Sequence, residues 1–475
     1  MTRYIVQVQP LTVVHIGTGE EFGPMDYVIR EQVYYRFRPE AIVATLDGEN
    51  RKSFNDLLDK GNIREIALFL HKHVTRKNAL YTSPAASSLA ATVKGKQNDL
   101  NNQLLIHSTY RSLTDGTPII PGSSLKGAIR TAILDDFASK LSQVRDERHP
   151  DKEILGYRDA KNDPFRGLRI SDCPISGEHY QAVAQFVNFK EKRKSGQDFS
   201  KMQIFSEIIT GALAEGDATG WCELQVDEEL LNVPNPNPKS PEKNYFGKRF
   251  TFNQLISACN AFYLKNLAKE IVKFYRHSSH RELKAMAEKL TRLGDEILQE
   301  KNQCLIRVGQ FSQVENVTLN EPHRQPWNKK GYGNTRTITD TYLPAGWVKL
   351  TFLTEAEAKE QQKRLNLKRE QARLKEEKIR LEKERKEVEA RAEAERLANL
   401  PEDQTMLIRI KKLPNDTSEI ANIVRECLES EFPASVFAAL REKLKELEQW
   451  NPSGSKQRKQ KMMKRNKDIE ARING

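Results

Sequence analysis

The chain has 475 residues, enough for two or three domains that each bury a core. Only 38% of its residues are hydrophobic, and its net charge of +12 favours an acidic partner, first of all nucleic acid and then an anionic membrane. No apolar window is long enough to span a bilayer, and the amino terminus resembles a strand rather than a signal peptide. We therefore expect a cytoplasmic protein with no membrane partner.

The spacing of the cysteines argues against a metal site or a disulfide framework. They form no C-x-x-C pair and have no histidine at ligand spacing, so we expect buried thiols in a reducing compartment. The five cysteines are Cys173, Cys222, Cys259, Cys304 and Cys427. We predict no cofactor and no metal.

Strands and helices alternate through the first 353 residues. Period-two alternation with β-branched and aromatic residues predicts the strands, and apolar residues three or four apart predict the helices. The expected strands are 4–14, 27–37, 167–173, 182–190, 304–308 and 347–353; the expected helices are 62–73, 120–141, 252–276 and 281–301; 203–213 fits either type. This mixture predicts an α+β fold of two modules.

Two stretches of the body lack a regular pattern. Residues 77–102 are polar and predict a surface excursion, and the three prolines within 235–241 predict a linker. The linker divides the body into a first module over 1–234, with a helical insertion, and a second over 242–353.

The composition changes abruptly after residue 353. Residues 354–400 are dominated by Glu, Lys, Arg, Gln, Ala and Leu and lack Gly and Pro, which predicts one long charged helix. Its apolar residues recur every seven positions without a second apolar seam, so a single solvated helix is favoured over a dimeric coiled coil. Residues 401–452 predict a small helical region. Residues 453–475 predict a basic tail that contacts RNA, with a solvating extension as the alternative.

The 120–134 segment carries the strongest functional signal. A Pro-Gly pair is followed by Ser123, Ser124 and Lys126, and a helix then places Arg130 one turn after the lysine. Hydroxyls, cations and the unpaired N–H groups of a helix start together favour an anion such as phosphate. The alternative is an ordinary turn with an N-cap. Because Gly-Ala follows the lysine, the segment does not match a Walker nucleotide site.

A glycine-rich loop follows the first strand, in the sequence His-Ile-Gly-Thr-Gly. Gly17 and Gly19 would let another backbone approach closely. His15 is a candidate general base for RNA cleavage, because an imidazole can accept a 2′-hydroxyl proton near neutral pH. A lone histidine at a strand end is more often structural.

A third loop, Arg-Val-Gly-Gln-Phe, lies near the end of the body. It would set Arg307 against a phosphate and Phe311 against a base. The alternative is a strand and turn with a core phenylalanine. Arg336 follows in a weak Tyr-Gly-Asn-Thr-Arg motif.

Taken together, the loops at 15–19 and 307–311 and the P-G-S-S-L-K-G-A-I-R segment at 121–130 resemble the RAMP proteins of type III CRISPR systems. They are most similar to the fifth-subunit family of the type III-A Csm complex. The resemblance covers about residues 1–353, and the charged helix and basic tail have no counterpart in it. It implies two ferredoxin-like, RRM-like modules that bind the 3′ portion of the CRISPR RNA and cap the filament of backbone subunits. It also implies RNA maturation through recruited host nucleases.

We therefore predict a noncatalytic RNA-binding subunit of an antiviral ribonucleoprotein, with CRISPR RNA and other Csm subunits as partners. The alternative is a metal-independent endoribonuclease that processes CRISPR RNA, with His15 as base and Lys126 stabilising the developing charge. A third hypothesis, compatible with the first, is a scaffold whose charged helix recruits partners. The predicted RNA-binding residues are His15, Gly17, Gly19, Ser123, Ser124, Lys126, Arg130, Arg307, Phe311 and Arg336.

Overall fold

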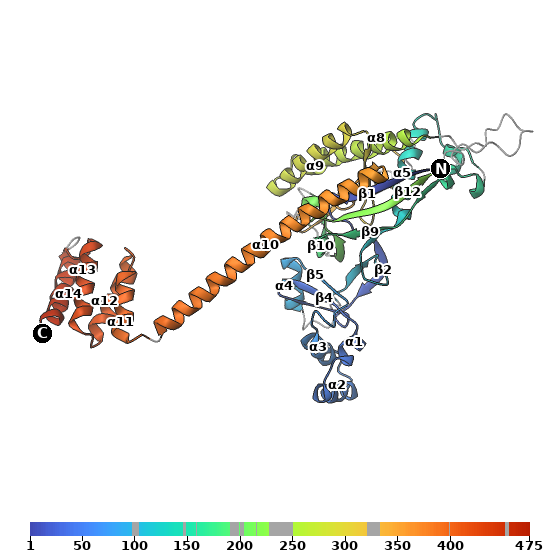
Figure 1. Ribbon diagram of the computed structural model, residues 1–475. Helices are drawn as coiled ribbons and strands as arrows, with labels where there is room; N and C mark the ends of the chain where they lie inside the picture. Colours follow the sequence, from blue (N-terminus) through green and yellow to red (C-terminus); the bar gives the residue numbers. More distant parts are fainter. Residues whose placement is uncertain are drawn as a thin grey trace, which may run out of the picture. The chain divides into compact units, whose positions relative to one another are not determined.

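The computed structural model divides the chain into two compact units, Met1–Leu365 and Asn366–Gly475 (Figure 1). It describes residues 1–96, 104–145, 149–157, 159–190, 199, 204–214, 216–227, 250–320, 333–398, 400–451 and 456–475. The predicted linker at 235–241 lies outside the described residues.

A seven-stranded sheet forms the centre of the first unit, in the order β13-β15-β1-β12-β9-β7, with β8 also paired to β12. Its strands are β1 (Thr2–Pro10), β7 (Ile119–Ile120), β8 (Leu168–Ile170), β9 (Cys173–Ser176), β12 (Thr219–Val226), β13 (Gln303–Arg307) and β15 (Trp347–Leu353). β1 pairs antiparallel with both β12 and β15. The sheet therefore joins strands from both sides of the linker, and the two predicted modules do not have separate sheets.

Two smaller sheets complete the first unit. A five-stranded sheet has the order β14-β10-β11-β6-β2, and a three-stranded sheet has the order β3-β4-β5. Their strands are β2 (Gly17–Phe22), β3 (Tyr27–Arg30), β4 (Val33–Arg36), β5 (Tyr81–Pro84), β6 (Ile106–Thr109), β10 (Gln181–Phe189), β11 (Ile204–Ile209) and β14 (Arg336–Thr339).

Two predictions for this region are wrong. The single strand expected over 27–37 is a hairpin, because the chain reverses at Glu31 and Gln32, whose φ angles are 51° and 61°. The excursion expected over 77–102 instead contains β5 and a helix, α4 (Ser87–Lys96), which buries Leu89 and Val93 in a core cluster. Its apolar residues are too few and too widely spaced to give a periodic signal.

Three helices pack on the seven-stranded sheet: α5 (Gly122–Ala138), α8 (Phe252–Glu270) and α9 (Arg281–Gln299). A capping box starts α8, since Gln254 N donates to Thr251 Oγ1 and Thr251 N donates to Gln254 Oε1. A π-helical turn over Ile271–Tyr275 follows α8. The remaining helices of this unit are α1 (Pro39–Ala44), α2 (Gly48–Lys60), α3 (Ile63–His73) and α6 (Pro150–Leu155).

A helix of 44 residues, α10 (Glu355–Ala398), runs from the first unit into the second. Four helices follow it: α11 (Glu402–Lys411), α12 (Thr417–Glu429), α13 (Ala434–Glu446) and α14 (Lys456–Asn474). The basic segment predicted as a tail is instead mostly helical, because residues 456–474 form α14. Met462 and Ile469 lie seven residues apart, on one face of this helix, and Ile469 is fully buried in the core of the second unit.

In the described part of the chain, no helix is long and apolar enough to cross a membrane.

Two glycines of α5 give a matched test of its packing. A Cβ at Gly122 would lie 2.2 Å from Ile170 O, so Gly122→Ala should push α5 off β8 and lower the free energy of unfolding by about 1–3 kcal/mol. A Cβ at Gly127 meets no atom within 4 Å. Gly127→Ala should therefore raise the free energy of unfolding by about 0.5–1 kcal/mol through lower backbone entropy. Urea unfolding followed by circular dichroism measures both, and equal effects would contradict this packing.

Candidate nucleic-acid interface

The glycine-rich segment at 15–19 is a loop only at its start, because Gly17 begins β2 and pairs with Thr109 of β6. Gly17 and Gly19 are exposed, whereas the His15 side chain is fully buried and its Nδ1 lies 2.7 Å from the backbone oxygen of Glu207 on β11. Burial lowers the pKa of His15, although the hydrogen bond to the Glu207 backbone opposes this. The buried, neutral imidazole therefore lies beneath Gly17 and Gly19 and holds this segment to β11 through the Glu207 backbone. It has no exposed surface for a 2′-hydroxyl, so the prediction that it contacts RNA or acts as a base is corrected.

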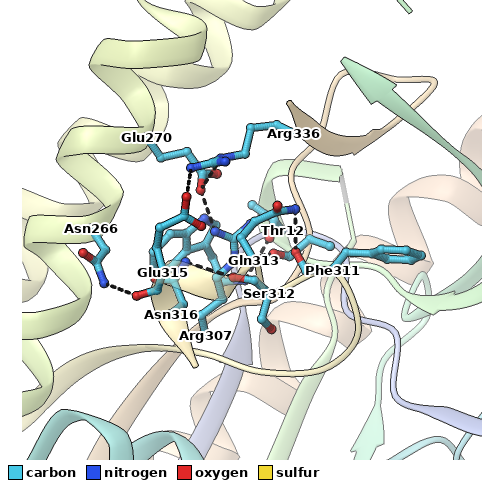
Figure 2. Close-up of polar contacts among 12 residues, drawn as sticks. Thr12, Asn266, Glu270, Arg307, Phe311, Ser312, Gln313, Glu315, Asn316 and Arg336 are labelled. Atoms are coloured by element: carbon cyan, nitrogen blue, oxygen red, sulfur yellow. Dashed lines mark hydrogen bonds and ion pairs between the residues drawn. The ribbon is translucent and has the colours of Figure 1, made fainter. Parts of the chain in front are cut away.

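The third predicted loop contacts the first. Gln310 N donates to His15 O over 2.9 Å, and a Cβ at Gly309, where φ is +85°, would lie 2.4 Å from the same oxygen. Only glycine permits this approach. Phe311 packs against Phe186 with ring centroids 4.6 Å apart (its ring is drawn in Figure 2). Phe311 therefore anchors the loop to the core rather than presenting a free ring to a base, and Gln310 is the exposed residue.

The start of α5 is linked to the glycine-rich loop by backbone hydrogen bonds. Tyr110 N donates to Ile16 O over 2.7 Å, and Ile119 N donates to Tyr110 O over 2.9 Å. The helix begins three residues after Ile119. Its first amide, Gly122 N, donates to Asp172 Oδ1 over 2.8 Å, so a carboxylate of the chain already occupies one of the N–H groups expected to bind phosphate.

Beyond that amide, the start of α5 remains accessible. Ser123 is exposed, and Ser124 and Lys126 are half-buried. Burial lowers the pKa of Lys126; Asp163 opposes this, and the charge of Arg169 on β8 adds to it. No described carboxylate forms an ion pair with Lys126. Lys126 and the exposed Arg169 thus place two cations without a described ion pair beside a helix N-terminus.

Arg130, one turn further along α5, is already paired. Its Nη1 lies 2.8 Å from Asp163 Oδ2, and its Nη2 donates over 2.8 Å to both Asp151 Oδ2 and Tyr157 Oη. Two carboxylates neutralise this guanidinium, and a phosphate would have to displace one of them. The prediction that Arg130 grips RNA is corrected, because its side chain fastens α5 to α6 and the turn after it.

Arg307 and Arg336 were also predicted to contact RNA, but they lie in a buried ion network (Figure 2). Glu270 Oε2 accepts from Arg307 Nη1 over 2.6 Å and from Arg336 Nε over 3.2 Å, and Arg336 Nη2 donates to Glu315 Oε1 over 3.2 Å. Both arginines are at most 3% exposed, and Arg307 also lies 4.6 Å from the centroid of the Trp347 ring. This prediction is corrected, since both guanidiniums are paired with buried carboxylates and almost fully removed from solvent.

The ion network fixes the loop that follows β13. Asn266 Nδ2 on α8 donates to Glu315 O over 2.8 Å, and Asn316 Nδ2 donates to Ser312 O over 2.9 Å (Figure 2). The π-helical turn brings Tyr275 five residues past Glu270, whose Oε1 accepts from its hydroxyl over 2.8 Å. The sequence predictions missed this network because its four charged residues lie on separate elements.

A second buried carboxylate was also missed. Glu207 Oε1 accepts from Tyr81 Oη over 2.7 Å, and Oε2 accepts from Thr109 N over 3.1 Å and Arg111 Nε over 3.2 Å. Its backbone oxygen also contacts His15. A single glutamate inside the apolar strand I-F-S-E-I-I was the available signal, because an unpaired carboxylate is rarely fully buried.

The ion network predicts a large loss of stability when its centre is neutralised. Glu270→Gln leaves the buried guanidinium of Arg307 without a carboxylate and leaves Arg336 with Glu315 alone, so it should lower the free energy of unfolding by about 3–5 kcal/mol. The matched control is Asp136→Asn, which breaks the exposed pair with Lys140 and should change stability by less than about 1 kcal/mol. Urea unfolding measures both, and a loss at Glu270 no larger than the control would contradict the network.

The same network predicts how stability depends on pH. Burial raises the pKa of Glu270, but Arg307 and Arg336 outweigh burial and hold it below its ordinary value of 4.5. A carboxyl whose pKa is lower in the folded chain stabilises it fully above the unfolded pKa and loses that contribution as the pH falls. We expect native stability to fall more steeply than that of Glu270→Gln as the pH drops below 4.5. Urea unfolding over a pH series tests this, and parallel curves would contradict it.

Comparisons with known proteins agree on a family. The chain matches the RAMP superfamily over residues 8–397. It is 26% identical over 290 residues to the "CRISPR system Cms protein Csm5" of Methanocaldococcus jannaschii, in a match that covers 57% of this chain and 62% of that protein. The match thus spans less than two thirds of the relative.

One solved structure shows a similar fold, and a second matches with a lower TM-score. A chain of the cryo-EM structure of a Csm-crRNA-target RNA ternary complex from a type III-A CRISPR-Cas system has a TM-score of 0.51 and 20% identity, covering 73% of this chain and all of that one. The crystal structure of Csm5 from T. onnurineus has a TM-score of 0.45 and 21% identity, covering 72% of this chain and 99% of its own. Since the family model matches most of its length, the chain belongs to the RAMP superfamily.

Proposed function

We propose that this chain is a noncatalytic RNA-binding subunit of a type III-A Csm effector complex. In this role it would cap the 3′ portion of the CRISPR RNA, contact the backbone RAMP subunits, and support RNA maturation by recruited host nucleases in antiviral defence. Membership in the RAMP superfamily and similarity to Csm5 support the placement in such a complex. The observation that carries the RNA contact is the junction of the exposed glycine-rich loop with the start of α5, joined through Tyr110.

We call this junction the loop–helix surface and define it by Gly17, Gly19, Ser123, Lys126 and Arg169. The glycines have no side chain to keep a sugar-phosphate backbone away. The hydroxyl, the ammonium and the guanidinium are donors suited to phosphate oxygens, and the helix start adds its positive dipole. Such a surface binds the RNA backbone without reading its sequence, as a subunit that holds many different guides requires.

The same geometry favours binding over cleavage. The imidazole proposed as a general base is buried beneath the loop, with Nδ1 engaged by the Glu207 backbone. A general base must come within hydrogen-bond reach of the proton that it removes. The predicted base therefore does not reach the loop–helix surface, and Nδ1 of the half-exposed His107, on the strand paired with β2, lies 3.4 Å from Glu21 Oε1.

Removing the two unpaired cations should weaken RNA binding in a salt-dependent manner. Lys126→Ala combined with Arg169→Ala should raise the Kd for CRISPR RNA and lower the slope of log K against log salt by about 1–1.5, because each lost phosphate contact on a single strand contributes about 0.7. Fluorescence anisotropy across a salt series measures this. Arg130→Ala is the matched control, and it should lower stability while leaving the slope nearly unchanged. An unchanged slope in the double variant would contradict the proposed surface.

The purified chain should not cut RNA. Labelled precursor CRISPR RNA incubated with the chain in EDTA should remain intact on a denaturing gel. Cleavage that disappears in His15→Ala would support the endoribonuclease instead and would show that the histidine becomes exposed when RNA binds.

A further inference from the structure

The second unit contains a groove between α12 and α14 with a volume of about 690 Å³. Its floor is aliphatic. Ile420, Val424 and Leu428 recur every four residues and form one stripe along α12, and Met462 contributes from α14. Ala421 is exposed at the groove, next to this stripe. The floor belongs to the second unit alone and is separate from the loop–helix surface.

The edges of the groove are basic. Arg425 on α12 and Arg458 on α14 are exposed, and Arg465 is half-buried further along α14. Among the described residues that line the groove, Glu429 is the one acid. Three guanidiniums around an aliphatic floor therefore present a strongly positive, partly apolar surface.

The surroundings of Arg465 favour a carboxylate over an uncharged group as the ligand of the groove. Its guanidinium donates to the backbone oxygen of Gln449 and to Asn466 Oδ1, both of them uncharged acceptors. Burial lowers the pKa of Arg465. A carboxylate brought beside this desolvated cation would form a charge-assisted hydrogen bond, which is stronger than a bond to a neutral acceptor.

We propose that this groove binds an acidic amphipathic helix of a partner protein. The apolar side of that helix would pack on the aliphatic floor, and its carboxylates would pair with Arg425, Arg458 and Arg465. Apolar anchors that recur at helical spacing are the usual way in which a helix occupies a hydrophobic groove. The positive edges then select helices whose flanking residues are acidic.

A protein fits these observations better than RNA does. An RNA held by its phosphate backbone would contact the arginines but would not cover the aliphatic floor, and none of the described residues that line the groove is aromatic, so its bases would have no ring to stack on. The outward lysines of α14, among them Lys461 and Lys464, are exposed and lie outside the groove lining. A nucleic acid would contact those lysines as well as the groove arginines. The two occupants therefore predict different effects of substitution at the two places.

The test uses the full chain and two labelled probes. The first is a fluorescein-labelled helical peptide with leucines at i, i+4 and i+7 and glutamates elsewhere, and the second is a labelled polyuridine RNA. Arg425→Glu with Arg458→Glu reverses the charge of the groove, and Ala421→Trp fills it without changing charge. Lys461→Glu with Lys464→Glu is the matched control, because it makes the same change in net charge outside the groove. Circular dichroism checks that each variant is folded.

We expect the acidic peptide to bind saturably to the native chain. Its Kd should rise about tenfold or more in both groove variants and stay within about twofold in the lysine control, because only the groove variants remove the pairing or the apolar contact. Three results would overturn the proposal: no saturable binding of the peptide, equal weakening by groove and control variants, or displacement of the peptide by polyuridine RNA. Loss of RNA binding at the loop–helix surface would leave this result unaffected.

Discussion

Two buried guanidiniums, those of Arg307 and Arg336, share the carboxylate of Glu270 and so hold α8, β13 and β14 together. Removing charges from water is costly, so this cluster is stable only while every member stays paired. Glu315 extends the cluster into the loop after β13, where Asn266 holds its backbone oxygen. The conformation of that loop is fixed because each buried charge of the cluster must have a partner of opposite charge.

The glycine-rich loop depends on this fixed loop. Gln310 N donates to His15 O, and Gly309 leaves the space for that contact. A separate carboxylate, that of Glu207, organises the other side through Tyr81 and an arginine of the β6–β7 connection. The buried carboxylates of Glu207, Glu270 and Glu315 thus position the backbone beneath the glycine-rich segment, where Gly17 and Gly19 add no side chains to the surface. Such an arrangement is consistent with the proposed binding of an RNA sugar-phosphate backbone.

In the second unit, a strongly basic helix packs on its neighbours through a few apolar residues. α14 carries eight cations and two acids, yet it folds onto its neighbours because Met462 and Ile469 fall on one face and are buried. The same packing forms the groove beside α12, where aliphatic floor and basic edges meet. In the first unit, Arg307 and Arg336 are buried in ion pairs, and the cations of the loop–helix surface lie at a helix start. In the second unit, the three arginines of the groove border an apolar floor, and this difference suggests separate partners for the two units.

Local patterns in the sequence were sufficient for much of the fold. Period two predicted β15 over its observed span, and apolar residues three or four apart predicted α3 and α5. Residue chemistry also selected the 15–19 and 120–134 segments, which are linked through the backbone of Tyr110 and Ile119, and their contact with RNA stays a prediction. The roles of the arginines could not be predicted, because a guanidinium that binds phosphate and one that pairs with a distant carboxylate look identical in sequence. Only tertiary structure brings Glu270 to Arg307 and Asp163 to Arg130, and only the packed interior makes those pairs obligatory.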